Sequence, residues 1–220
     1  MYFHWRSQMN TESFLQELTT YLIERHHCHT ILLYGSYSSG DFTPESDIDV
    51  VGFADSFREK NDTAVFLGKQ LDAWIYPTKQ HRFAEEFLQL HEAEVLLDER
   101  NIATRLLKDV DRLISRGPGD LSTDEKNFLI AWLWKMESRA RKNDVEGNYR
   151  RNWLLVDSLE IYFELRGVWF FGPKKSLAWI KENDQEAYEL FDRALVNNVE
   201  TKDIVELIVF LENMAFPGTD

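Results

Sequence analysis

The first half of the chain alternates between short apolar runs and polar breaks. Residues 11–26 place five apolar side chains at helical spacing, which predicts an amphipathic helix with Phe14, Leu15, Leu18, Tyr21 and Leu22 on one face. Four later runs are rich in β-branched and aromatic residues or alternate between apolar and polar positions, as strands do. The predicted strands are Thr30–Tyr34, Asp47–Phe53, Gln70–Tyr76 and Ala93–Leu97. A second helix is predicted over 101–115.

Strand-like patterns stop at Gly117-Pro118-Gly119, a strong breaker of regular structure. Helical spacing dominates the rest of the chain. The predicted helices cover 123–142, 150–166, 174–183, 185–196 and 201–213. We therefore expect an α/β domain over residues 1–117, built as a short mixed sheet with flanking helices. We expect an all-α domain over residues 118–220 that binds a substrate or a partner.

Composition narrows the class of protein. The chain carries 38 acidic against 25 basic side chains, a formal net charge of −13. Binding to nucleic acid by general electrostatics needs a basic face, so we expect no nucleic-acid partner. No apolar run reaches the ~18–20 residues of a membrane span, so we expect no membrane partner. The first ten residues lack the apolar centre of a signal peptide, and Cys28 is the single cysteine, which together favour a cytoplasmic location.

The segment from Tyr34 to Val51 carries the candidate chemistry. Asp47 and Asp49 stand two apart on a predicted strand, so both carboxylates point to the same side. Hard cations such as Mg²⁺ take oxygen ligands, commonly one or two carboxylates together with substrate phosphates. Upstream, Gly35 and Ser36 follow a strand and open a predicted helix, where backbone amides and a hydroxyl can bind phosphate oxygens. The segment therefore predicts a phosphate cradle beside a metal clamp.

A third carboxylate would complete a two-metal site, and Asp72 is the best candidate. By alternation, Asp72 shares one face of its predicted strand with Trp74 and Tyr76, while the apolar residues between them face the other way. Acidic residues are disfavoured in the middle of strands, so the polar face indicates a role for it.

These residues carry a resemblance. The spacing G-S-x-x-x-G-x-x-x-x-x-S-D-I-D, with Gly40 and Ser46 in place, resembles the signature of the DNA polymerase β-like nucleotidyltransferase superfamily. It is most similar to the small bacterial branch that includes the aminoglycoside and the minimal nucleotidyltransferases. The position after Gly-Ser is often arginine in that branch, whereas here it is Tyr37.

The resemblance implies a mechanism and a set of roles. Asp47, Asp49 and Asp72 would ligate two Mg²⁺ ions, with Asp72 as an alternative general base. Gly35, Ser36 and Ser46 would bind the phosphates of ATP or another nucleoside triphosphate. Two metal ions ~3.5–4 Å apart stabilise both the attacking and the leaving oxygen when a nucleoside monophosphate is transferred and pyrophosphate leaves.

The helical half offers weaker candidates. The stretch 135–151 holds six basic against three acidic side chains, and Lys135, Arg139 and Lys142 fall at helical spacing. Lys135 and Arg139 are candidate triphosphate contacts, although a solvated helix face with ordinary ion pairs between successive turns is the favoured interpretation of the stretch. Glu160 and Glu164 are alternatives to Asp72 as the general base. The aromatic stretch Gly167–Trp179 is expected to line a substrate cleft or a homodimer contact.

The histidines His26, His27 and His29 resemble a metal cluster, but no acidic or cysteine partners follow at ligand spacing. We therefore expect an ordinary helix-end cluster there.

Three functions stay open at this point. The first is an enzyme that moves AMP from ATP to a hydroxyl of a small molecule such as an antibiotic. The second is an antitoxin-like nucleotidyltransferase that modifies a partner protein. The third is a nucleotide-binding module without catalysis, against which the three aspartates argue.

Overall fold

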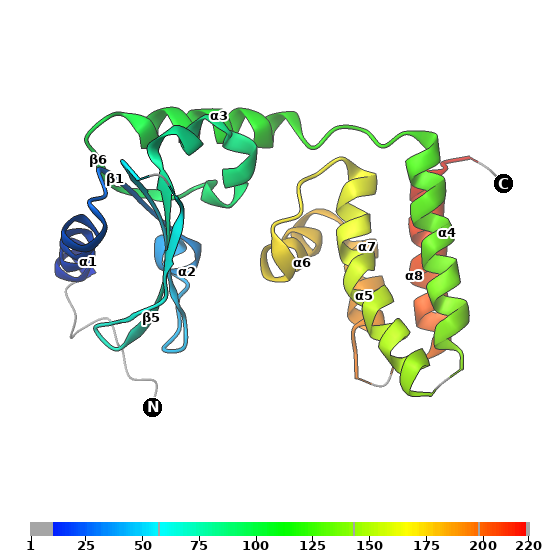
Figure 1. The fold of residues 1–220 in the computed structure, drawn as a ribbon. Coiled ribbons are helices and arrows are strands. Elements are labelled where there is room, and N and C mark those ends of the chain that lie inside the picture. Colours follow the sequence, from blue (N-terminus) through cyan, green and yellow to red (C-terminus); the bar gives the residue numbers. More distant parts are fainter. Residues whose placement is uncertain (1–10, 57, 143, 198, 219–220) are drawn as a thin grey trace. The chain divides into compact units, whose positions relative to one another are not determined.

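The computed structural model describes residues 11–56, 58–142, 144–197 and 199–218, so the predicted absence of a signal peptide falls on residues outside it. The chain divides into two compact units, Met1–Ser115 and Arg116–Asp220. The first combines a mixed sheet with flanking helices and the second consists of helices, as predicted (Figure 1). Within the described residues, no helix is both long and apolar enough to cross a membrane.

The N-terminal unit is built on a sheet with the strand order β3-β5-β2-β1-β6, and β4 pairs with β5. Strand β2 runs parallel to β5, whereas the other pairs are antiparallel. Its strands are β1 (Thr30–Tyr34), β2 (Ile48–Ala54), β3 (Lys60–Asp62), β4 (Val65–Phe66), β5 (Lys69–Pro77) and β6 (Glu94–Asp98). Its helices are α1 (Thr11–His26), α2 (Gly35–Ser39) and α3 (Ile102–Arg116), with 3-10 turns η2 (Thr78–Arg82) and η3 (Ala84–Leu90).

Helices cover both faces of this sheet. On one face, Ile31, Val50 and Ala73 pack with α1, whose buried residues Phe14 and Leu18 lie on the predicted apolar stripe. On the other face, α3 and η3 pack against β1 and β2 through Leu32, Val51, Phe53, Phe87 and Leu106. Because strand residues alternate between faces, Asp49 and Asp72 belong to the face that α3 covers in part.

The α3 helix starts where a carboxylate can satisfy its free amides. Asp98, at the end of β6, accepts hydrogen bonds from the backbone N–H groups of Ile102 (2.7 Å), Ala103 (3.1 Å) and Thr104 (3.0 Å). Burial opposes ionisation of this group, but the backbone hydrogen bonds prevail and lower the pKa of Asp98. This contact fixes the connection from the sheet into the helix.

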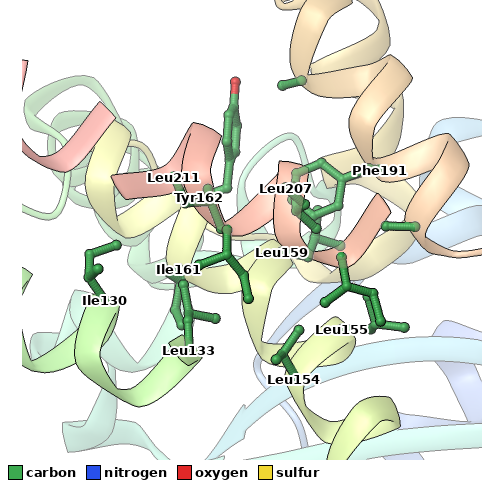
Figure 2. Close-up of a cluster of buried hydrophobic side chains, with 14 of the residues drawn as sticks. Ile130, Leu133, Leu154, Leu155, Leu159, Ile161, Tyr162, Phe191, Leu207 and Leu211 are labelled. Atoms are coloured by element: carbon green, nitrogen blue, oxygen red, sulfur yellow. The ribbon is translucent and has the colours of Figure 1, made fainter. Parts of the chain in front are cut away.

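The C-terminal unit comprises α4 (Thr123–Ala140), α5 (Val145–Arg166), α6 (Gly172–Asn183), α7 (Gln185–Ala194) and α8 (Thr201–Ala215). Ser122 and Glu125 form a capping box at the start of α4, and Gly167 ends α5 with a φ of 64°. Figure 2 shows the core, where side chains from α4, α5, α7 and α8 meet, among them Leu133, Phe191 and Leu207. Each buried side chain of this size contributes about 1.5–3 kcal/mol to stability.

Two sequence predictions were incomplete. The α5 helix begins at Val145 rather than 150, because Asp144 caps it by accepting from the N–H of Gly147 at 2.7 Å. The short strands β3 and β4 were missed, since neither has an apolar pattern long enough to predict a strand.

Candidate active site

A row of polar side chains crosses the centre of the sheet. Asp49 of β2 is paired with Asp72 of β5 in parallel register and with Tyr34 of β1 in antiparallel register. Residues paired in this way point to the same face, so the three side chains are neighbours. Asp47 precedes β2 by one residue and is exposed, whereas Asp49 and Asp72 are half-buried. The alternation predicted for β5 is confirmed, since Leu71, Ala73 and Ile75 are buried on the opposite face.

The crowding of negative charge changes the acidity of the central carboxyl. Burial, followed by the charges of Asp72 and Asp47, raises the pKa of Asp49 to about 6. Burial and then the charges of Asp49 and Asp72 also raise the pKa of Tyr34. The ionised form of Asp49 is therefore held at a cost in free energy that a cation would relieve.

The backbone at Gly35 lies directly against Asp49. Gly35 has a φ of 70°, and a Cβ built on it would overlap with Oδ2 of Asp49 and lie 3.1 Å from its Cγ. Any other residue would meet both the left-handed backbone conformation and the carboxylate. Ser36 follows in the first turn of α2, half-buried, and its hydroxyl has no hydrogen-bond partner among the described residues. The phosphate-binding candidates Gly35 and Ser36 thus adjoin the carboxylate candidates.

Aromatic stacking shapes the segment between Ser36 and Asp47. The ring of Tyr37, which stands where arginine is frequent in similar sequences, stacks on Phe42 with centroids 4.5 Å apart and planes 4° apart. Tyr37 also packs on Phe14 of α1 at 6.0 Å. Tyr37 therefore has a packing role. Its contact with Phe42 holds together the two sides of the segment between Ser36 and Asp47.

Ser46 closes a turn just before Asp47. Its hydroxyl accepts a hydrogen bond from the N–H of Thr43 at 2.8 Å, and its own N–H donates to the carbonyl of Thr43 at 3.1 Å. Lys69, at the start of β5, donates to the carbonyl of Pro44 at 2.6 Å. Ser46 thus orients the entry into β2, and the phosphate contact predicted for it stays a prediction.

The three candidate metal ligands, Asp47, Asp49 and Asp72, are all carboxylates, and carboxylate oxygens suit a hard divalent cation. Among the described residues, no group of three or more His, Cys, Asp or Glu side chains is arranged to hold a metal ion. Mg²⁺ is commonly bound by one or two carboxylates plus substrate phosphates, so a closed set of protein ligands is not required. The residues therefore fit such an ion in the presence of a triphosphate.

The histidines at the end of α1 make other contacts. His26 Nε2 lies 2.6 Å from the buried Asp62, and His29 bonds to the hydroxyls of Thr30 (3.0 Å) and Thr78 (2.8 Å). Burial lowers the pKa of His29. His27 is exposed with a φ of 56°. The three side chains therefore make separate contacts at and after the end of α1.

The remaining candidates belong to the helical unit. Lys135 and Arg139 are exposed on α4, whereas Arg141 pairs with Glu137 at 2.6 Å. The triphosphate contacts of Lys135 and Arg139 stay predictions.

The two glutamates proposed as bases lie on α5, Glu160 exposed and Glu164 half-buried. Burial and then neighbouring carboxylates raise the pKa of Glu164. Glu164 lines a cavity of about 610 Å³ within the helical unit. The other lining side chains are largely acidic or apolar, among them Asp120, Asp124 and Phe128.

Sequence reasoning missed Asn61. It lies on the short strand β3, and its amide Nδ2 donates to Oδ1 of Asp72 at 2.9 Å. Only the polar tripeptide Lys60–Asp62 marks this strand in the sequence, and that pattern predicts a loop.

The comparisons with known proteins give one family match, which covers part of the chain. A family model described as a nucleotidyltransferase domain matches residues 15–116. Among solved structures, the chain is similar to a nucleotidyltransferase-like protein from Exiguobacterium sibiricum 255-15, with 10% identity and a TM-score of 0.47. That similarity covers 94% of this chain and 74% of the other. No curated protein matches. Residues 15–116 span the sheet, α2 and the aspartates Asp47, Asp49 and Asp72, so the part of the chain that carries the candidate site is similar to nucleotidyltransferase domains.

Proposed function

We propose that the protein transfers a nucleoside monophosphate, AMP when ATP is the donor, to a hydroxyl group of a small molecule. The observation that supports this most is the group of three aspartates, Asp47, Asp49 and Asp72, next to Gly35 and Ser36. Carboxylates on β2 and just before it, next to the start of α2, offer binding groups for a metal-bound triphosphate, which is what phosphoryl-group chemistry requires.

The residues would divide the work as follows. Asp47 and Asp49 would hold the divalent cation, which neutralises charge on the triphosphate when bound. Ser36 would donate its free hydroxyl to a phosphate oxygen. The acceptor oxygen forms a bond to the α-phosphorus, the bond from that phosphorus to the bridging oxygen breaks, and pyrophosphate leaves. Asp72 would accept the proton of the acceptor hydroxyl, with its Oδ2 free of hydrogen bonds from the described residues.

A cationic acceptor fits the charges of this chain best. The net charge is −13, and the carboxylates of Asp47, Asp49 and Asp72 gather at the candidate site itself. Carboxylates attract ammonium groups. Aminoglycosides, which carry several amines and hydroxyls, are therefore the first acceptors to test.

The experiment measures transfer of label from [α-³²P]ATP in the presence of Mg²⁺ to aminoglycosides, lincosamides and candidate proteins. We expect label on a drug and release of pyrophosphate. Asp47→Asn and Asp49→Asn should abolish both, whereas Asp109→Asn, which removes only an exposed pair with Arg112 on α3, should not. Label on a protein would support the antitoxin-like alternative. Binding of ATP without release of pyrophosphate under any of these conditions would exclude both enzymatic functions.

A further inference from the structure

We propose that Asn61 is a positioning residue that orients the carboxylate of Asp72, and that β3 exists as a strand in order to hold it there. The proposal deepens the proposed function, on which it rests for the role of Asp72. The pairing of strands in the sheet brings Asn61 and Asp72 close together. Asn61 is paired with Trp74 in the antiparallel β3–β5 ladder, and Asp72 lies two residues before Trp74 on the same face. Asn61 and Asp72 are therefore diagonal neighbours across two strands.

The hydrogen bond between them is specific in its geometry. Asn61 Nδ2 donates to Oδ1 of Asp72 at 2.9 Å, an ordinary distance for an N–H···O bond. Oδ2 of Asp72 receives no hydrogen bond from the described residues. One oxygen is thus held by the protein, while the other remains available to a ligand or a proton.

Asp72 needs such a restraint because of its neighbour. Its partner across the β2–β5 ladder is Asp49, so two carboxylates stand side by side on one face, and like charges in that position repel. A free aspartate side chain would relieve this repulsion by rotating away from Asp49. A neutral amide donor holds the carboxylate in place and adds no positive charge that would compete with a cation.

The opposite face of β3 shows how a three-residue strand stays in position. The next residue, Asp62, is buried and faces α1, where it accepts hydrogen bonds from Tyr21 Oη (2.9 Å) and His26 Nε2 (2.6 Å). Arg25 approaches the same oxygen at 3.3 Å, and the N–H of Ala64 donates to the other oxygen at 3.1 Å. Asp62 therefore anchors the edge strand to α1, and alternation turns Asn61 toward Asp72.

The test replaces Asn61 by leucine, which has a similar shape and no donor, and by glutamine, which keeps the amide. Lys60→Leu is the matched control, because Lys60 precedes Asn61 on β3, is exposed, and pairs with Ile75 of β5, which places it on the face opposite to Asn61. Asn61→Leu should lower kcat for nucleotidyl transfer by about 10²-fold, since misplacement of a reacting group by ~1 Å has that effect. KM for ATP should change less than about threefold, Asn61→Gln should recover part of kcat, and circular dichroism should show all variants folded.

Two further measurements separate positioning from a general effect on structure. In an Asp72→Asn background, Asn61→Leu should lower kcat no further, because Asn61 acts through Asp72. The ¹³Cγ resonance of Asp72, assigned by its loss in Asp72→Asn, should shift and broaden in Asn61→Leu and stay unchanged in Lys60→Leu. This resonance is measured without substrate, so it decides the proposal even if the wild-type protein transfers no nucleotide, a result that would refute the proposed function alone. An unchanged resonance, a kcat equal to that of Lys60→Leu, or additive losses in the double variant would overturn the role of Asn61.

Discussion

Replacing Gly35 by alanine tests why this position needs glycine. The two possible reasons are its backbone conformation and its contact with Asp49, a candidate metal ligand, and a control variant separates them. The φ of 70° at Gly35 costs an L-residue roughly 1–2 kcal/mol, so the variant should be less stable by at least that amount. The new methyl group would also overlap with Oδ2 of Asp49. The methyl carbon would also lie 3.1 Å from Cγ of Asp49, and restoring an ordinary carbon–carbon separation of ~3.5–4 Å moves the carboxylate by roughly 0.4–0.9 Å.

A shift of this size should lower kcat by about 10²-fold, because carboxylate, phosphate and attacking oxygen must stay aligned. The assays are urea denaturation of each variant and steady-state transfer from ATP. Gly68→Ala is the matched control: its φ is 81°, so it carries a similar strain, but nothing lies within 4 Å of the added methyl group. Equal losses of kcat in Gly35→Ala and Gly68→Ala would refute the argument that Gly35 is required by its contact with Asp49.

Three further predictions concern charge and capping. Because the folded pKa of Asp49 is raised to about 6, its ionisation destabilises the fold above that pH, and Asp49→Asn should raise the free energy of unfolding by about 1 kcal/mol at pH 8 without divalent cation. That gain should shrink as the pH falls from 6 to 4, and its persistence at pH 4 would contradict the cause given. The pKa of Asp98 is lowered, so Asp98→Ala should cost about 0.5–2 kcal/mol at pH 7, and the difference should disappear in acid as wild-type Asp98 becomes protonated. Ser122→Ala removes the capping box of α4 and should cost about 1 kcal/mol in thermal unfolding; no change in Tm would indicate that Glu125 caps the helix alone.

The sequence predicted those parts of the fold where the apolar pattern decides the structure. The long strands and the stripe of α1 follow from side chains that must be buried, and the polar face of β5 that carries Asp72 follows from alternation, whereas its pairing with Asp49 is seen only in the structure. The start of α5 was misplaced because its first turns expose Val145 and Tyr149, which blurs the amphipathic pattern. That start depends instead on a single cap from Asp144.

In the candidate site too, the sequence predicts residues that a motif or a regular pattern marks and misses those that single contacts hold in place. Gly35, Ser36 and the aspartates lie in one motif or on predicted strands, so their proximity could be predicted. Asn61 could not be found in this way, because β3 is held by hydrogen bonds of Asp62 to α1 rather than by an apolar run. A contact formed across a strand that no pattern marks becomes visible only in three dimensions.

The stacked rings of Tyr37 and Phe42 also bear on how the chain tolerates change in length. They close the excursion that leaves Ser36 and returns toward Asp47, so the end of α2 and the turn through Gly40, which lie between the rings, have a fixed base. The entropic cost of closing a loop rises only slowly with its length. Insertions between Tyr37 and Phe42 should therefore enlarge a surface bulge and leave the spacing of Ser36 and Asp49 intact, whereas insertions between Phe42 and Asp47 would shift the aspartate pair itself.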